Sequence, residues 1–168
     1  RARLMAHRAF FGLQSVLMGP MPGTEIERQL WQHFHVQQKH SEQREQVLNV
    51  LRGTYVKLSG APQFRCTAPK DPYCESFGAY VARGERPVYL CQRFFKSLST
   101  ADHESPWVLV HEAAHLAGTK NDHAYFFTFG SAPSCGDTTS LSRDKAIDNA
   151  DSYAYFAYCV SRKGGKSS

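Results

Sequence analysis

The sequence predicts a single α+β domain that is mainly helical and contains a small β-sheet. Its 168 residues are enough for one hydrophobic core and too few for two comfortable domains. Apolar residues at helical spacing dominate residues 1–58, whereas short runs rich in Tyr, Val and Phe alternate with Pro, Gly and Asp over residues 59–95. Residues 105–162 are expected to hold a helix, a loop and a C-terminal helix. We therefore expect a domain over residues 1–162 and a flexible tail at 163–168.

Two long segments near the N-terminus have few helix breakers. Residues 2–18 and 24–57 repeat apolar side chains at helical spacing, and the run G-P-M-P-G at residues 19–23 separates them. Thr24, with Glu27 three residues later, has the spacing of a capping box, which predicts a helix start. We expect three histidines of the second segment on a solvated helix face rather than in a metal site: His33, His35 and His40.

Charge and hydropathy argue against specific nucleic-acid binding and against a membrane span. The net charge is +5, from 20 Lys and Arg against 15 Asp and Glu. The basic residues are scattered singly apart from the tail S-R-K-G-G-K-S-S, and no aromatic and basic pattern of a nucleic-acid-binding module accompanies them. No stretch reaches the roughly 18 apolar residues that a membrane span needs. We expect a monomer that has no membrane span and binds no specific nucleic acid.

The cysteine content favours an oxidising compartment. The chain has five cysteines and no C-x-x-C pair, a pattern more typical of disulfides than of a thiolate zinc site. Five buried, reduced cysteines in a cytosolic protein are the alternative. We expect a secreted, periplasmic or otherwise extracellular protein. Because the chain starts at Arg1 rather than Met, it is expected to be a processed form or a domain of a larger exported protein.

A short helix with clear boundaries is expected over residues 105–117. Ser105 can serve as its N-cap, Pro106 fits the first helical position, and Gly118 can end it in the left-handed conformation. The residues between them, W-V-L-V-H-E-A-A-H-L-A, are mostly apolar and contain an H-E-x-x-H motif. The motif therefore lies on a helix with an apolar face.

The H-E-x-x-H motif has the spacing of a zinc hydrolase. His111 and His115 are four residues apart, so both imidazoles leave one face of the helix and can bind a single tetrahedral metal. Glu112 points to the side of this pair, where a carboxylate can take a proton from an attacking water. The alternative is a helix whose histidines only pack in the core, and the apolar helix with candidate ligands just after it argues against that.

A catalytic zinc needs a third protein ligand, and the sequence narrows the choice. No glutamate follows Glu112, which excludes a glutamate from a later helix. The pattern H-E-x-x-H-x-x-G-x-x-H fails because Asn121 stands at its last position. Asp122 remains, with His123 as a rival that spacing alone does not exclude. Tyr125, three residues after Asp122, can donate a hydrogen bond to an oxyanion that develops when water attacks a carbonyl.

These motifs together resemble the aspzincins, the family of deuterolysin and peptidyl-lysine metalloendopeptidase. The H-E-x-x-H motif is followed by Gly-Thr, an Asp and a Tyr three residues after it. The stretch F-G-A-Y-V-A-R-G-E-R-P-V-Y-L-C-Q-R-F-F at 77–95 is similar to the family's strand segment before the zinc helix. The stretch A-I-D-N-A-D-S-Y-A-Y-F-A-Y-C-V at 146–160 is similar to its C-terminal helix. The likeness covers about residues 60–162.

The resemblance implies a mainly helical, zincin-like fold with the small sheet beside the H-E-x-x-H helix. It implies one Zn²⁺ held by His111, His115 and Asp122. Glu112 would be the general base and then the proton donor, and Tyr125 the oxyanion partner. The implied activity is hydrolysis of peptide bonds in protein or peptide substrates.

The site loop departs from the family pattern at two places. Lys120 and Asn121 both precede Asp122, where the family has one residue, and Phe126 stands where a glycine follows the tyrosine. The shortness of this loop leaves the third ligand, Asp122 or the rival His123, for the structure to decide.

The resemblance also suggests disulfide pairs and a substrate contact. The pairs are Cys74 with Cys91 and Cys135 with Cys159, which leaves Cys66 over. In lysine-specific relatives an acidic pair lines the pocket for the residue after the cleaved bond, and the corresponding positions here are Asp151 and Ala154. Asp151 as a substrate-binding residue would give a basic preference without strict lysine specificity; the equal alternative is a structural hydrogen-bond acceptor.

Two other functions stay open from the sequence. The first is a toxin-like effector domain of a larger protein with a dedicated target, such as a cell-wall peptide or one host protein. The second is a non-catalytic zinc-binding interaction module. Glu112 and Tyr125 argue against the second, because a purely structural zinc site needs neither residue.

Overall fold

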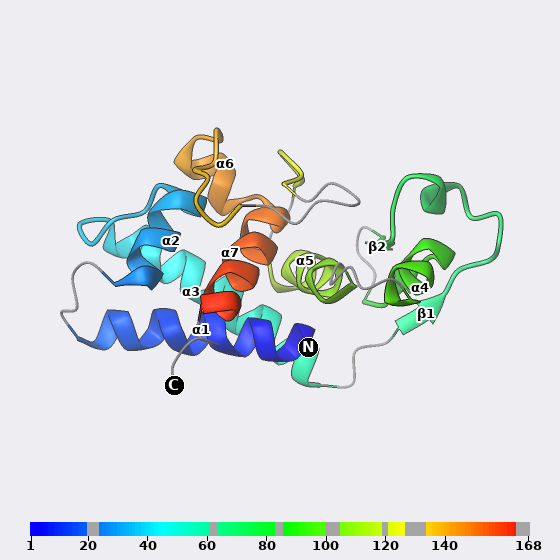
Figure 1. Cartoon of the computed structure of the whole chain (residues 1–168), viewed down its shortest axis with the longest axis horizontal. Coiled ribbons are helices and arrows are strands. Elements are labelled where there is room, and N and C mark those ends of the chain that lie inside the picture. The colour runs from blue at the N-terminus through cyan, green and yellow to red at the C-terminus, as the bar shows by residue number, and fades with distance from the viewer. Residues whose placement is uncertain are drawn as a thin grey trace.

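The structure is mainly helical, with a three-stranded sheet toward one end (Figure 1). The expected α+β class with a small sheet is confirmed. The computed structural model describes the following parts of the chain: residues 1–19, 24–60, 64–82, 86–99, 105–118, 121–126 and 134–163.

The N-terminal helices agree with the sequence in position but not in number. Helix α1 spans Ala2–Met18, as expected, and α2 (Glu25–Phe34) begins with Glu27 N–H donating to Thr24 Oγ1 at 3.3 Å. The second expected segment is broken into α2 and α3 (Ser41–Ser59). His35 causes the break: it adopts a left-handed conformation with φ +51° and its N–H bonds the carbonyl of Trp31. No glycine marks this helix end in the sequence.

The expectation of a solvated histidine face on α2 is wrong for His33. The ring is fully buried, and its Nε2 lies 2.7 Å from Gln29 Oε1 on the preceding turn. It packs against Tyr155 and Phe156 of α7 (Ala150–Lys163), with ring centroids 4.3 and 6.3 Å apart. Polar residues on α2 therefore form part of a packed interface.

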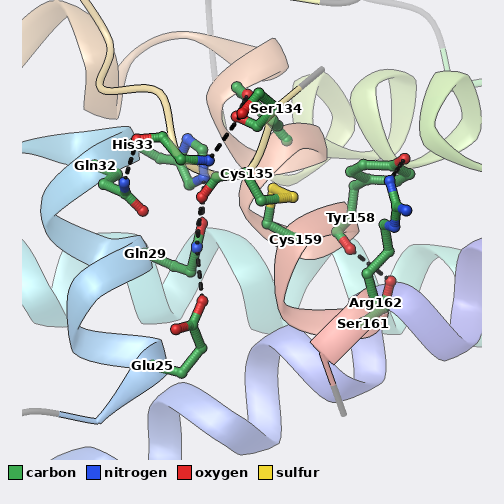
Figure 2. Close-up of a disulfide and its surroundings, with 12 residues drawn as sticks. Glu25, Gln29, Gln32, His33, Ser134, Cys135, Tyr158, Cys159, Ser161 and Arg162 are labelled. Carbon is green, nitrogen blue, oxygen red and sulfur yellow. Dashed lines mark hydrogen bonds between the residues drawn. A yellow bond between two sulfur atoms is a disulfide. The ribbon is translucent and has the colours of Figure 1, made fainter. Parts of the chain in front are cut away.

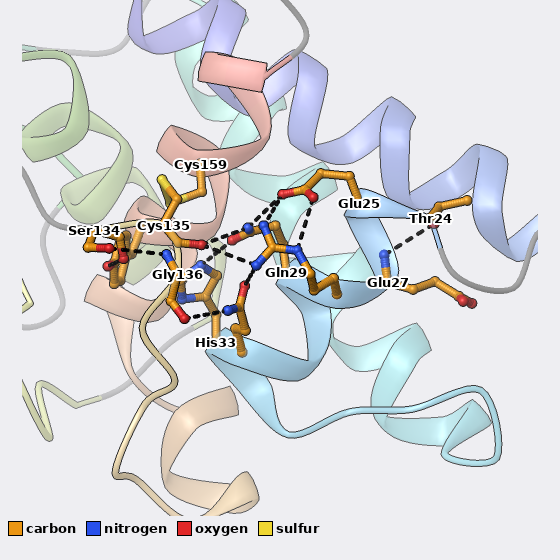
Figure 3. A network of polar contacts seen from close by, with 12 residues as sticks. Thr24, Glu25, Glu27, Gln29, His33, Ser134, Cys135, Gly136 and Cys159 are labelled. Carbon is orange, nitrogen blue, oxygen red and sulfur yellow. Dashed lines mark hydrogen bonds and ion pairs between the residues drawn. A yellow bond between two sulfur atoms is a disulfide. The ribbon is translucent and has the colours of Figure 1, made fainter.

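A polar network joins α2 to the loop that precedes α6 (Arg143–Ile147) (Figure 3). Gln29 Nε2 donates to the carbonyl of Cys135 at 3.0 Å, and Gln32 Nε2 donates to that of Gly136 at 2.6 Å. Cys135 also forms a disulfide with Cys159 of α7 (Figure 2). Side-chain amides and a covalent bond thus hold one short loop against two helices.

The sheet contains the short strands expected before residue 95. Strands β1 (Phe64–Cys66), β2 (Ala79–Val81) and β3 (Val88–Leu90) lie in the order β1-β3-β2. β1 pairs parallel and β2 antiparallel with the central β3, and β2 packs against α5 (Ser105–Ala117). α4 (Gln92–Ser99) follows β3 and packs near α5 (Figure 1).

Helix α5 lies between two hydrophobic clusters. On one side it packs against α1, α3 and α7, and α7 is almost completely buried. On the other side a smaller cluster, which includes Val88, Phe94 and Val108, joins α5 to the sheet. The helix that carries H-E-x-x-H is therefore held on both sides by buried apolar surface, which contributes about 25 cal/mol per Å² removed from water.

Both suggested disulfides are confirmed. Cys74, in the 3₁₀ turn Pro72–Glu75, pairs with Cys91 after β3, and Cys135 pairs with Cys159; Cys66 is free and exposed. Such bonds form and persist in oxidising compartments. None of the described helices is long and apolar enough to span a membrane. Of the expected tail, Lys163 ends α7, and residues 164–168 lie outside the described part.

Candidate active site

Helix α5 presents both histidines of the motif toward the same point. It begins at Ser105, the residue expected as its N-cap and so one residue before the expected first helical position, and it ends before Gly118, whose φ of +133° requires the conformational freedom of glycine. His115 Nε2 lies 3.2 Å from His111 Nε2. Two imidazole nitrogens one helical turn apart thus converge, as the spacing predicts.

The third donor is the carboxylate of Asp122. Its Oδ1 lies 3.3 Å from His111 Nε2, and its Oδ2 lies 3.3 Å from His115 Nε2. In a tetrahedral site with bonds of about 2.0–2.1 Å, neighbouring ligand atoms are about 3.3–3.4 Å apart. The three residues form the one such group of possible metal ligands among the described residues. Donor types and spacings therefore fit a zinc ion with one position left for a water or a substrate.

His123, the rival ligand, points elsewhere. Its Nε2 lies 3.3 Å from Asp148 Oδ2, just before the N-terminal end of α7. Asn121 Nδ2 donates to the same carboxylate oxygen at 2.6 Å. The residues on either side of Asp122 are thus both held by Asp148, and Asp122 alone of the three faces the histidine pair.

Asn149 holds the site loop on the N-terminal end of α7, a contact that sequence reasoning missed. Its Oδ1 accepts hydrogen bonds from the main-chain N–H groups of His123 at 2.7 Å and Ala124 at 3.1 Å. Asn121 also pairs with Asn149 through a short parallel bridge. The available signal was the stretch at 146–160 that resembles the family's C-terminal helix, because it contains Asn149. These bonds position Asp122 from both sides, while residues 119–120 lie outside the described part.

Asp151 lies behind the histidine pair. The side chain is 0 % exposed, its Oδ1 lies 3.1 Å from His111 Nδ1, and its Oδ2 accepts from the main-chain N–H of Phe126. Ala154, the second position of the expected acidic pair, is also fully buried. The placement of Asp151 agrees with the alternative of a structural hydrogen-bond acceptor. It orients His111 so that Nε2 faces the other donors.

Tyr125 lies at the edge of the donor group. Its phenol donates to Asp122 Oδ2 at 3.1 Å, and its ring lies roughly parallel to that of His111 with centroids 5.9 Å apart. Half of the side chain is exposed. Burial of the rest and the charge of Asp122 raise the pKa of Tyr125, so the phenol keeps its proton and remains a hydrogen-bond donor.

Burial and neighbouring charges shift the pKa values of the site residues in opposite directions. Burial acts to lower the pKa of His111, but the hydrogen bond to Asp151 and the charge of Glu112 outweigh it and raise the pKa to about 9. Burial raises the pKa of Glu112, although a hydrogen bond from the main chain of Val81 in β2 opposes the shift. Burial also acts to raise the pKa of Asp122, but the two histidines outweigh it and lower that pKa.

A cavity of about 160 Å³ opens beside these residues. His111, Glu112 and Tyr125 form the side nearest the donor group, and residues 76–79 and the start of α5 form the rest. The arrangement thus combines a metal-binding triangle, a carboxylate next to it, a phenol donor and a space for a bound molecule.

Comparison with known proteins places this site in a family. The sequence model of the aspzincins, described as Lysine-specific metallo-endopeptidase, matches residues 24–158, which is most of the chain. The chain belongs to the aspzincin family. The peptidyl-Lys metalloendopeptidase of Grifola frondosa is 34% identical over 70 residues, which cover 42% of this chain and 19% of that relative. The matched stretch thus spans less than a fifth of the relative's length.

A solved structure shows the same aspzincin fold. The zinc peptidase from Grifola frondosa superposes with a TM-score of 0.65 and 23% sequence identity, over 93% of this chain and 86% of that one. The expected zincin-like arrangement, with the small sheet beside the H-E-x-x-H helix, is confirmed. The departure at Phe126 is compatible with this aspzincin site, because the structure uses the main-chain N–H of Phe126 to bind Asp151.

Proposed function

We propose that this chain is a zinc-dependent endopeptidase that hydrolyses peptide bonds in protein or peptide substrates. The convergence of His111, His115 and Asp122 carries the proposal: the two Nε2 atoms lie 3.2 Å apart, and each lies 3.3 Å from a different oxygen of the Asp122 carboxylate. Glu112 lies beside it and lines a cavity open to a substrate. A purely structural zinc site has four protein ligands and needs neither a general base nor such a cavity.

Glu112 would carry the proton through the reaction. A bound zinc ion supplies a Lewis acid that makes a water molecule nucleophilic near neutral pH. The Glu112 carboxylate, which the N–H of Val81 holds in place, accepts a proton from the attacking water. It then gives this proton to the leaving amine, so that one peptide bond and one water yield a carboxylate and an amine.

Tyr125 and Asp151 support this chemistry in different ways. The phenol of Tyr125 lies next to Asp122 and His111, where it can donate a hydrogen bond to the carbonyl oxygen of the scissile amide as that oxygen gains charge. Asp151 does not reach the substrate. It is a positioning residue that fixes the ring of His111 through Nδ1.

Glu112→Gln is the direct test of the proposed activity. The variant keeps the size of the side chain and all three metal donors, so we expect stoichiometric zinc by metal analysis. Casein cleavage should fall about 10²–10⁴-fold, the usual contribution of a general acid–base group. Glu45→Gln on the exposed face of α3 is the matched control and should retain activity. Normal cleavage by Glu112→Gln would refute the role of Glu112.

The same digest separates the proposal from the two alternatives. A broad endopeptidase cleaves casein or a peptide library, and a chelator abolishes the cleavage. An effector with a dedicated target binds zinc but leaves both casein and the peptide library intact. A non-catalytic module also binds zinc but cleaves no substrate at all. We further propose that the chain works outside the cytosol, which the two disulfides support. We also propose that it works as a monomer.

A further inference from the structure

The cavity beside the donor group has apolar walls. The side chains of Phe77, Ala79, Trp107 and Val108 line it, and Tyr125 closes the side next to the histidines. Phe77 and Tyr125 face each other with ring centroids 6.4 Å apart. The loop before β2 and the first turns of α5 therefore supply an aromatic and aliphatic surface within reach of the scissile bond.

The size of this cavity corresponds to one apolar side chain. Its volume is about 160 Å³, and an apolar cavity of about 150 Å³ is known to hold a benzene molecule. Because Glu112 and His111 are part of its lining, whatever fills it lies next to the reacting bond. A leucine-sized to phenylalanine-sized side chain of a residue flanking that bond matches this space.

A lysine side chain would find no carboxylate available to it among the described lining residues. Glu112 is the one acidic group there, and it is engaged as the base and by the N–H of Val81. Asp151 is fully buried against His111, and Ala154 has no charge to offer. Placing an ammonium group in apolar surroundings without a partner is strongly unfavourable. The charge pattern therefore disfavours a basic occupant.

We propose that this cavity is a specificity pocket that receives an apolar side chain, leucine-sized to phenylalanine-sized, from the substrate residue next to the cleaved bond. The inference rests on the proposed endopeptidase function and names its substrate class. It differs from the lysine preference that gives the family model its description.

A peptide library with one varied position on each side of the cleaved bond tests the preference. At the position that fills the pocket, kcat/KM for Leu or Phe should exceed that for Lys by at least about tenfold, since filling an apolar pocket is worth about 10–200-fold. Equal or better cleavage beside Lys overturns the inference but leaves the endopeptidase function intact.

Two pairs of variants locate the preference in this pocket. Phe77→Ala should lower kcat/KM for the Phe peptide about tenfold. Phe95→Ala removes a similarly exposed ring, 44% against 39%, outside the pocket and should not lower it. Ser76→Asp adds a carboxylate to the rim and should raise cleavage beside Lys several-fold, whereas Ser15→Asp on α1 should not. If the two variants of either pair behave alike, the assignment of the preference to this pocket is contradicted.

A binding measurement tests the pocket independently of activity. The chain has two tryptophans, so Trp31→Phe leaves Trp107, in the pocket wall, as the only fluorophore of its kind. Phenylalaninamide should change this fluorescence with at least about tenfold higher affinity than lysinamide. Equal or tighter binding of lysinamide overturns the inference. If no peptide is cleaved, the endopeptidase proposal fails and this titration alone decides the inference about the pocket.

Discussion

Two buried histidines, one on each side of α7, have opposite electrostatic environments. His33 on α2 is 0% exposed and His111 on α5 is 6% exposed, and both side chains contact residues of the buried helix α7. The pKa of His33 is lowered to about 3, chiefly by burial and then by Arg28, whereas that of His111 is raised to about 9. Two histidines of similar burial thus have pKa values shifted in opposite directions.

The difference comes from what α7 offers to each ring. Toward His33 it presents the rings of Tyr155 and Phe156, and Nδ1 of His33 has no hydrogen-bond partner among the described residues. Toward His111 it presents the carboxylate of Asp151, and Asp122 lies on the other side of the ring. The apolar surroundings of His33 favour a neutral ring that packs in the core. The carboxylates around His111 favour positive charge at that position. Converging carboxylates, rather than burial, therefore distinguish a ligand from a core residue.

The largest expected effect on the His111 side of α7 is a loss of zinc affinity when the charge of Asp122 is removed. Asp122→Asn replaces a carboxylate ligand by an amide of the same shape, so we expect zinc affinity to fall more than about 100-fold, beyond the effect of changing an outer partner of a ligand. Competition with a chelator of known affinity measures the loss.

His123→Asn is the control for this experiment. The imidazole of His123 is held by Asp148, so zinc affinity should remain close to that of the unaltered chain. If His123→Asn loses zinc and Asp122→Asn keeps it, the assignment of the third ligand is reversed.

The next effect concerns the carboxylate that α7 places behind the ring. Asp151→Asn keeps an oxygen that can accept from His111 Nδ1 but loses the charge, and it puts amide hydrogens near the N–H of Phe126. Zinc affinity should fall about 10–100-fold. Asp144→Asn on the exposed face of α6 is the matched control and should leave zinc affinity unchanged.

A purely structural role for Asp151 predicts a different result. In that case Asp151→Asn would lower the melting temperature of the chelated protein and leave zinc affinity unchanged. We expect the opposite pattern, with the larger change in zinc affinity.

Much of the fold could be predicted because its signals are local. The bounds of α1 follow from apolar spacing between breakers, and the cap at Thr24 follows from the distance to Glu27. The break after α2 could not be predicted, since a histidine rather than a glycine takes the left-handed position at His35. The burial of His33 depends on contacts with α7 more than a hundred residues away, which local pattern does not contain.

The site shows the same division. His111, Glu112 and His115 follow from helix geometry alone, and the structure brings the expected Asp122 to them. The choice between Asp122 and His123 could not be made by spacing, because it depends on how Asp148 and Asn149 bind the loop. The apolar pocket was also out of reach, since its lining comes from three separate parts of the chain, residues 76–79, residues 107–112 and Tyr125.

The smallest expected effect is on the apolar side of α7 and appears as a dependence of stability on pH. The folded state keeps His33 neutral down to its pKa of about 3, whereas the unfolded chain protonates it near 6.5. Between these values the unfolded chain binds the extra proton, so the free energy of unfolding falls as pH falls, by at most about 1.4 kcal/mol per pH unit.

His33→Leu removes this contribution. Denaturant unfolding of the chelated protein at pH 6.5 and pH 5 should therefore show a shallower pH dependence for His33→Leu. Leu30→Ala on the same helix should lower stability at both pH values and keep the original slope, and an unchanged slope in His33→Leu would mean that His33 is not held neutral.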